Sequence, residues 1–145
     1  MQSAEFLRQV AKLDRDSLEQ VMRDLADSRA DGDLEKIGKV LTEDVRMELA
    51  CAQPTFPYFG KFHGREAVLS ALGRMRLDIE YQNYETLALL VDHDCGFMRR
   101  RALLRHRGTN RSGYVEIWDH FRFRDGLVSE LVYFPDFPAL MALSR

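Results

Sequence analysis

Apolar residues recur every three to four positions over the first forty residues, which is the period of an amphipathic helix. Within this stretch, Asp16 followed by Glu19 has the pattern of a helix N-cap with its reciprocal partner. After a break, a second short helix is expected over 34–41. Residues 44–49 then alternate between apolar and polar side chains, which predicts a strand.

The rest of the chain is dominated by alternation, apart from two segments. Residues 51–63 combine prolines, a glycine and aromatic residues and are expected to form a loop, and the helical period returns over 64–75. The dipeptide Asp125–Gly126 is typical of a two-residue hairpin turn. Strands are expected at 84–92, 95–107, 114–124 and 127–134. This order of elements predicts an α+β domain, with helices covering one face of a curved, mainly antiparallel sheet.

The size and composition are those of one soluble globular domain over residues 1–145, with 46% apolar and 30% charged residues. The net charge of −2 gives no electrostatic reason to expect a nucleic acid or an anionic membrane as a partner. Cys51 and Cys95 are too few for a disulfide framework, so both are expected as reduced thiols. Because the sequence shows neither a signal-peptide pattern nor a long apolar run, a cytoplasmic location is expected.

One of the expected strands carries a carboxylate in an apolar row. In YVEIWDHFRF (114–123), Asp119 lies in the middle of a core-facing row whose other members are Val115, Ile117, Phe121 and Phe123. The preceding strand has a matching exception, Arg100, which shares its face with Met98, Ala102, Leu104 and His106. A lone buried carboxylate is costly, so either a partner or a protonated form is expected for Asp119.

Antiparallel pairing across the hairpin can bring these two exceptions together. Opposite residues keep a constant sum of residue numbers, and this sum must be odd for Arg100 and Asp119 to share one face. A loop centred near residue 110 suggests a sum of 219, which sets them directly opposite, or of 221, which makes them diagonal neighbours. Three interpretations remain open: an acid/base or oxyanion-binding group in a pocket, a structural ion pair, or a bulge that turns Asp119 outward.

Three stretches together resemble the SnoaL-like and ketosteroid-isomerase-like proteins of the nuclear-transport-factor-2-like superfamily. They are ADGDLEKIGKVLTEDVRME (30–48), GREAV (64–68) and DHFRFRDGLVSELVYFPD (119–136), in this order along the chain. The resemblance implies a cone-shaped barrel, in which a curved mixed sheet wraps over N-terminal helices and encloses an apolar pocket. It also implies a homodimer.

The resemblance further implies roles for single positions. Asp119 matches the oxyanion-hole Asp of ketosteroid isomerase, whereas that enzyme's helix Tyr and general-base Asp fall on Leu25 and Leu49. Arg100 matches the Arg of the Arg-x-Asp pair in limonene-epoxide-hydrolase relatives, and Ala102 takes the place of the Asp. The expected catalytic residues are Asp119, Arg100, Tyr133 and His106. The expected ligand-binding residues are Leu25, Leu49, Tyr58, Phe59, Met98, Ala102, Ile117 and Phe121.

These residues predict a protein that binds a small apolar organic molecule and catalyses proton transfer without a cofactor, as in isomerisation, cyclisation or dehydration. Asp119 would be the acid/base or oxyanion donor, with Arg100 as its partner. The alternative is a non-catalytic ligand-binding or interaction module of the same fold. Trp118 and His120 lie on the opposite sheet face, where the homodimer contact is expected. No metal, nucleic-acid or membrane partner is expected, since a turn explains DHDC (92–95) better than a metal site.

Overall fold

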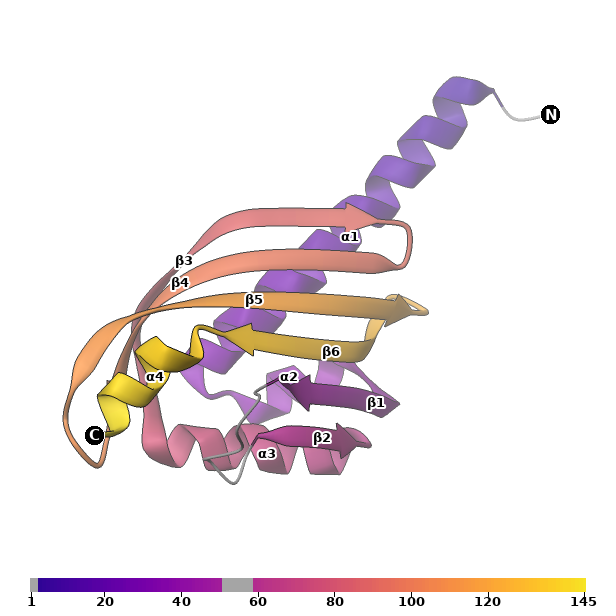
Figure 1. The fold of residues 1–145 in the computed structure, drawn as a ribbon. Helices are drawn as coiled ribbons and strands as arrows, with labels where there is room; N and C mark the ends of the chain where they lie inside the picture. The colour runs from indigo at the N-terminus through magenta and orange to yellow at the C-terminus, as the bar shows by residue number, and fades with distance from the viewer. Residues whose placement is uncertain (1–2, 51–58) are drawn as a thin grey trace.

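The computed structural model describes residues 3–50 and 59–145. The helices in this part of the chain are α1 (Ala4–Asp31), α2 (Leu34–Val40), α3 (Arg65–Asp78) and α4 (Phe137–Ser144). The strands are β1 (Leu41–Leu49), β2 (Gly60–His63), β3 (Ile79–Asp92), β4 (Cys95–His106), β5 (Ser112–Arg124) and β6 (Leu127–Pro135). Figure 1 shows these elements as one α+β unit, which confirms the predicted fold class.

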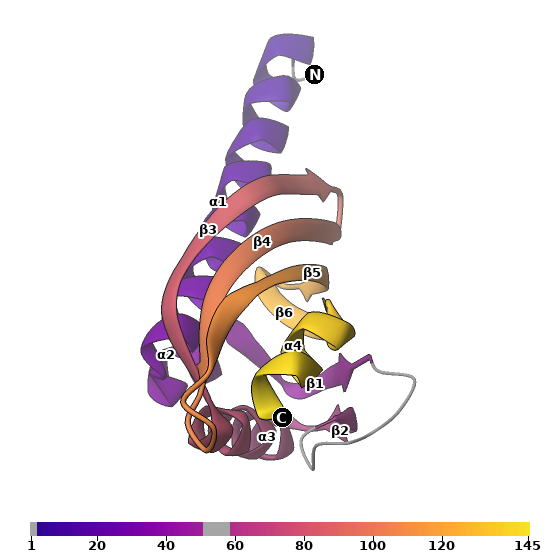
Figure 2. The same cartoon turned by 60° about the vertical axis from the view of Figure 1, so that its left-hand side comes forward.

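The strands form one curved sheet in the order β2-β1-β6-β5-β4-β3 (Figure 1). β1 and β6 are parallel, and all other neighbours in this order are antiparallel, so the sheet is mixed. Figure 2 shows how β3, β4 and β5 bend along their length. The sheet does not close on itself, because β2 and β3 are its two edges. The face covered by α1 and α3 is called the inner face below, and the opposite one the outer face.

α1 covers most of the stretch with helical period, as predicted, but its N-cap is not Asp16. The side chain of Ser3 accepts a hydrogen bond from the N–H of Phe6 and caps the helix, so Asp16 lies inside α1 and the N-cap predicted there is wrong. The residues before Asp16 are mostly good helix formers, and neither glycine nor proline interrupts them. The helix ends at Gly32, whose φ of 74° is a left-handed conformation that glycine adopts without strain.

Two short elements lie where the sequence analysis predicts none. β2 occupies part of the expected 51–63 loop and pairs with β1 at the sheet edge; a strand of four residues is too short for alternation to reveal it. α4 follows β6, and the carboxylate of Asp136 caps it by accepting from the N–H of Ala139.

β3 begins at Ile79, directly after α3, rather than near residue 84 as predicted.

The alternation predicted for β4 and β5 is confirmed. Even-numbered residues of β4 and odd-numbered residues of β5 are the buried ones along most of each strand. The hairpin turn between β5 and β6 is confirmed as well, since Asp125 and Gly126 have φ values of 54° and 77°. These two hairpins fix which side chains of β4, β5 and β6 meet on the inner face.

Candidate functional site

Arg100 and Asp119 lie on the same buried face, as the alternation predicts, but in a different register. Met98 lies opposite Asp119, and Arg100 lies opposite Ile117, which gives a constant sum of 217. The predicted odd parity is therefore confirmed, whereas the values 219 and 221 are wrong. The reason is a tighter turn than expected: Ser112 already belongs to β5, and Asn110, with φ of 61°, closes the loop. Arg100 and Asp119 are consequently diagonal neighbours.

The two side chains form a buried ion pair. Nε of Arg100 donates to Oδ2 of Asp119 at 2.8 Å, and the side chains are 0% and 2% exposed. Burial lowers the pKa of Arg100, but the carboxylate of Asp119 and the nearby Tyr81 raise it by more, so this pKa lies above its ordinary value. Arg100 is therefore a cation, and the interpretation that a bulge turns Asp119 outward is wrong.

Tyr133 connects this ion pair to Tyr81 on the inner face of the sheet. It lies opposite Asp119 in the pairing of β5 with β6, and its hydroxyl oxygen accepts from Nη2 of Arg100 at 2.9 Å. The same oxygen lies 3.3 Å from the hydroxyl oxygen of Tyr81, which comes from β3. Tyr81 is missing from the predicted site residues because it precedes the expected start of its strand. The site thus combines residues from β3, β4, β5 and β6.

A second guanidinium, that of Arg29 in α1, lies over the ring of Tyr133. Its Cζ is 3.6 Å from the ring centroid, a distance typical of a cation–π contact. Desolvation lowers the pKa of Arg29 to about 10, so the group is still charged near neutral pH. The sequence analysis misses Arg29, although a signal exists. Arg29 follows Met22 and Leu25 at helical spacing and therefore lies on the buried face of α1.

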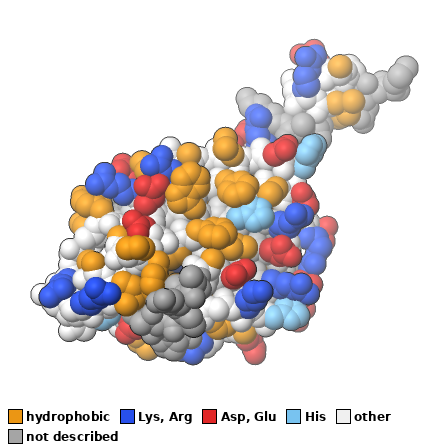
Figure 3. All heavy atoms as spheres, viewed as in Figure 1, with side chains coloured by type: hydrophobic (Ala, Val, Ile, Leu, Met, Phe, Trp, Pro, Cys, Tyr) orange, Lys and Arg blue, Asp and Glu red, His pale blue; other side chains and the backbone are white. Residues whose placement is uncertain are grey.

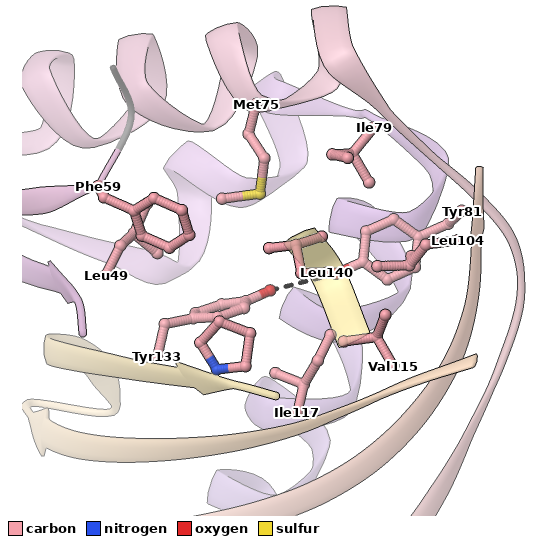
Figure 4. A pocket seen from close by; sticks show the side chains of 11 residues that line it. Leu49, Phe59, Met75, Ile79, Tyr81, Leu104, Val115, Ile117, Tyr133 and Leu140 are labelled. Atoms are coloured by element: carbon pink, nitrogen blue, oxygen red, sulfur yellow. Dashed lines mark hydrogen bonds between the residues drawn. The ribbon is translucent and has the colours of Figure 1, made fainter. Parts of the chain in front are cut away.

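Tyr81 and Tyr133 both belong to the lining of an apolar pocket between the sheet, α3 and α4 (Figure 4). The cavity itself has a volume of about 30 Å³ and continues into a recess of about 390 Å³ that includes open solvent. The described residues that line it are Leu49, Phe59, Met75, Ile79, Tyr81, Leu104, Val115, Ile117, Tyr133, Pro135 and Leu140. Figure 4 shows the hydroxyls of Tyr133 and Tyr81 directed toward each other among these apolar side chains. The described residues that line the pocket include no carboxylate.

The structure distributes the predicted site residues over three places. Leu49, Phe59, Ile117 and Tyr133 line the pocket. Leu25, Met98, Ala102 and Phe121 are buried in the hydrophobic core and are not among the lining residues. Arg100 and Asp119 are also outside the lining, and Arg100 reaches it through its hydrogen bond to Tyr133. Tyr58 lies outside the described residues.

Comparison with protein families identifies this architecture. Residues 22–131 match the model of the SnoaL-like domain. The chain belongs to the SnoaL-like domain family. No curated protein matches this SnoaL-like chain.

Solved structures similar to the SnoaL-like chain share its whole fold. One is a candidate isomerase from Rhodopseudomonas palustris, with 24% identity and a TM-score of 0.75 over 89% of this chain and 97% of the other. Another is an LEH-like epoxide hydrolase from M. tuberculosis, with 14% identity, a TM-score of 0.71 and coverage of 90% and 92%. A candidate SnoaL-like polyketide cyclase from Jannaschia sp. CCS1 has 18% identity, a TM-score of 0.73 and coverage of 89% and 92%. At these identities the likeness shows the fold, and the match to the SnoaL-like domain model confirms the predicted SnoaL-like resemblance.

His106 does not join the buried cluster of the SnoaL-like chain. Its Nδ1 accepts hydrogen bonds from the backbone N–H groups of Gly108 and Thr109, at 3.1 and 3.2 Å, in the turn between β4 and β5. The imidazole therefore holds the turn at the end of β4. A catalytic role for His106 stays a prediction.

The outer face of the SnoaL-like sheet carries exposed aromatic side chains, among them Phe97, Tyr114 and Trp118. Figure 3 shows hydrophobic side chains gathered over the strands on this side of the molecule. Arginines lie between them: Arg99 pairs with Glu116, and Arg101 lies over the ring of Tyr114, with 4.2 Å from Cζ to the ring centroid. The homodimer expected through this face stays a prediction.

Cys95 also lies on the outer face, as a free thiol with its Sγ 2.9 Å from Nε2 of His120. Cys51 lies outside the described residues. Over residues 3–50 and 59–145, no three His, Cys, Asp or Glu side chains are grouped so that they could hold a metal ion. In the same ranges, no helix is long and apolar enough to cross a membrane.

Proposed function

We propose that this SnoaL-like protein binds a small, largely apolar molecule with a carbonyl-type oxygen and catalyses cofactor-free proton transfer on it, as in isomerisation, cyclisation or dehydration. The apolar lining suits the body of such a molecule. The two tyrosine hydroxyls suit its oxygen, and they are the observation that carries the proposal.

The number of hydroxyl protons supports a donor role for this pair. The oxygen of Tyr133 accepts from Arg100, and one further hydrogen bond joins the hydroxyls of Tyr133 and Tyr81. Each phenol has one proton, and that bond uses only one of the two. Whichever tyrosine donates, one O–H is left over for an acceptor. A carbonyl oxygen in the pocket is such an acceptor.

The buried ion pair strengthens this donor. The cation of Arg100 bonded to the oxygen of Tyr133 stabilises negative charge that spreads onto the phenol as its proton is shared with the ligand. Asp119 does not touch the pocket, so its proposed acid/base contribution is indirect. It holds Arg100 in position and balances its charge. Tyr133 is the proposed acid that contacts the ligand.

A non-catalytic ligand-binding module is the second candidate. The observation that favours it is the absence of a carboxylate or imidazole from the described lining, which leaves no side-chain base beside the ligand. At the positions that match the helix Tyr and the general-base Asp of ketosteroid isomerase, this chain has Leu25 and Leu49. The lack of both catalytic groups agrees with this candidate. The two candidates differ in whether a bound ketone reacts.

Exchange of the α-protons of 2-tetralone in D₂O, followed by ¹H NMR, tests the proposal without knowledge of the natural substrate. Polarisation of the ketone oxygen acidifies the adjacent C–H groups. A solvent or buffer base then takes the α-proton, the enolate oxygen is stabilised by the Tyr133 hydroxyl, and a deuteron from D₂O returns to carbon, so the wild-type protein should accelerate exchange above the buffer rate. Tyr133→Phe should reduce the protein-dependent rate by about 100-fold. Asp119→Asn should reduce it by a smaller factor, since Asn still accepts from Nε of Arg100.

The matched control is Glu116→Gln, which removes an equivalent charge from the outer face of the same strand and should leave exchange unchanged. The dissociation constant of 2-tetralone should stay the same in Glu116→Gln. Tyr133→Phe loses a hydrogen bond to the ketone and should bind more weakly, so exchange rates are compared at saturating 2-tetralone. Binding without accelerated exchange by the wild-type protein would favour the non-catalytic module. Unchanged exchange in Tyr133→Phe would exclude Tyr133 as the acid.

A further inference from the structure

Arg29 is a buried cation without an anionic partner among the described residues. It is only 6% exposed. Its contacts are the ring of Tyr133 and the sulfur of Met75, which lies 3.9 Å from Nη2. A thioether sulfur is a weak acceptor, and an aromatic face compensates a desolvated guanidinium only in part. Arg29 therefore lacks the directly bonded carboxylate that a buried arginine normally has.

The charges of the cluster lead to the same conclusion. Arg29 and Arg100 contribute two positive charges, and Asp119 is the carboxylate that faces them. Asp119 is bonded to Arg100, and no carboxylate of the described chain lies within ion-pair distance of Arg29. The buried cluster therefore carries an excess of one positive charge beside the apolar pocket. An anion is the occupant that would neutralise it.

A second hollow shows where the anion would lie. Arg29 and Arg76 line a narrow space between α1, α2 and α3 with a cavity volume of only about 10 Å³, so an anion fits there only when a lining side chain moves. This hollow and the pocket have three lining residues in common, Met75, Ile79 and Tyr81. Met75 is the unbranched one of the three, and its sulfur is the atom that contacts Arg29. A change of its rotamer would connect the two spaces.

We propose that the ligand carries a carboxylate, which replaces the Met75 sulfur beside Arg29 while the apolar body of the ligand fills the pocket. This inference rests on the proposed function for the location of the pocket, and it adds the substrate class: a small apolar acid. A guanidinium binds a carboxylate through two parallel hydrogen bonds, which a sulfur atom does not offer. The burial of Arg29 excludes water that would otherwise weaken this contact.

The test compares two probes of nearly equal shape, 2-naphthoic acid and 2-acetylnaphthalene, by titration calorimetry at neutral pH. The wild-type protein should bind the acid at least about tenfold more tightly than the ketone. Arg29→Met, which keeps much of the side-chain volume, should abolish this preference by weakening the binding of the acid far more than that of the ketone. Arg29→Lys keeps the charge without the two-pronged geometry and should retain part of the preference.

Arg101→Met is the matched control, because Arg101 also lies over a tyrosine ring but on the outer face. It removes the same charge and should keep the full preference for the acid. Equal affinities of the wild-type protein for the two probes would overturn the inference and leave the pocket proposal standing. Binding of neither probe would overturn both. A preference that survives in Arg29→Met would overturn the role of Arg29.

Discussion

Two arginine–carboxylate pairs occupy neighbouring positions on the same two strands, one on each face of the sheet. On the inner face, Arg100 and Asp119 are 0% and 2% exposed. On the outer face, Arg99 and Glu116 are 40% and 35% exposed. Both pairs have short contacts between nitrogen and oxygen, so their geometry hardly distinguishes them. What differs is the solvent around them.

This difference decides what each pair does for the protein. Water screens the outer pair, and such pairs contribute little to stability. The inner pair has lost its hydration, and a buried pair of this kind is often no more stabilising than apolar side chains of the same size. Stability alone therefore does not explain Arg100 and Asp119. Under the proposed function, the hydrogen bond from Arg100 to the Tyr133 hydroxyl supplies a role that a leucine and a methionine could not perform.

The largest expected effect comes from breaking the inner pair. Asp119→Leu leaves the guanidinium of Arg100 buried without its counterion, and the free energy of unfolding should fall by about 3–5 kcal/mol in urea titrations. The double variant Arg100→Met with Asp119→Leu should lose much less, because no uncompensated charge remains. A double variant as unstable as Asp119→Leu would contradict the view that the pair is dispensable for stability.

A smaller loss is expected when the hydroxyl of Tyr133 is removed. Tyr133→Phe deprives Nη2 of Arg100 of its acceptor and breaks the contact with Tyr81, so the free energy of unfolding should fall by about 1–3 kcal/mol. Tyr114→Phe on the outer face is the control for the same chemical change and should have no measurable effect in the same titrations. Equal losses in the two variants would mean that the inner hydroxyl has no special energetic role.

The smallest effect is expected from the outer pair, and it should depend on pH. The hydrogen bond from Arg99 holds the pKa of Glu116 below its ordinary value. A carboxyl with a depressed pKa stabilises the folded protein above its unfolded-state pKa, and this contribution is lost as the pH falls through the folded-state value. Glu116→Gln should therefore be slightly less stable than wild type at about pH 7 and equal to it at about pH 3. A difference that grows toward acid pH would show that the sign is wrong.

The sequence contains enough information to place Arg100 and Asp119 on the inner face, because the two-residue period of a strand predicts the face of each residue. Their register is not predictable to the same degree. It depends on a turn in which Asn110 adopts a left-handed conformation, and composition alone did not indicate where that turn begins. Parity survives such an error because a shift by two residues keeps every side chain on its face.

Arg29 and Tyr81 show the opposite case. Each comes from an element whose contribution to the inner face depends on tertiary packing. Arg29 is reachable from the helical spacing of α1, but a charged residue in a helix is ordinarily assigned to the solvent side. Tyr81 belongs to a stretch of β3 where the pairing with β4 is irregular, so neither the helical period nor the two-residue period of a strand identifies the face on which it lies. The pocket itself, assembled from separated segments, has no local signal at all.

The parallel pairing of β1 with β6 has a consequence for the rate at which the pocket forms. Leu49 and Tyr133, on opposite sides of the pairing, both line the pocket, yet most of the chain separates them. Closing so long a loop is entropically unfavourable, and contacts of this kind slow folding. If this closure follows the main folding barrier, a ligand has nothing to bind until that barrier is crossed. Such a ligand would lengthen the lifetime of the folded protein without accelerating its folding.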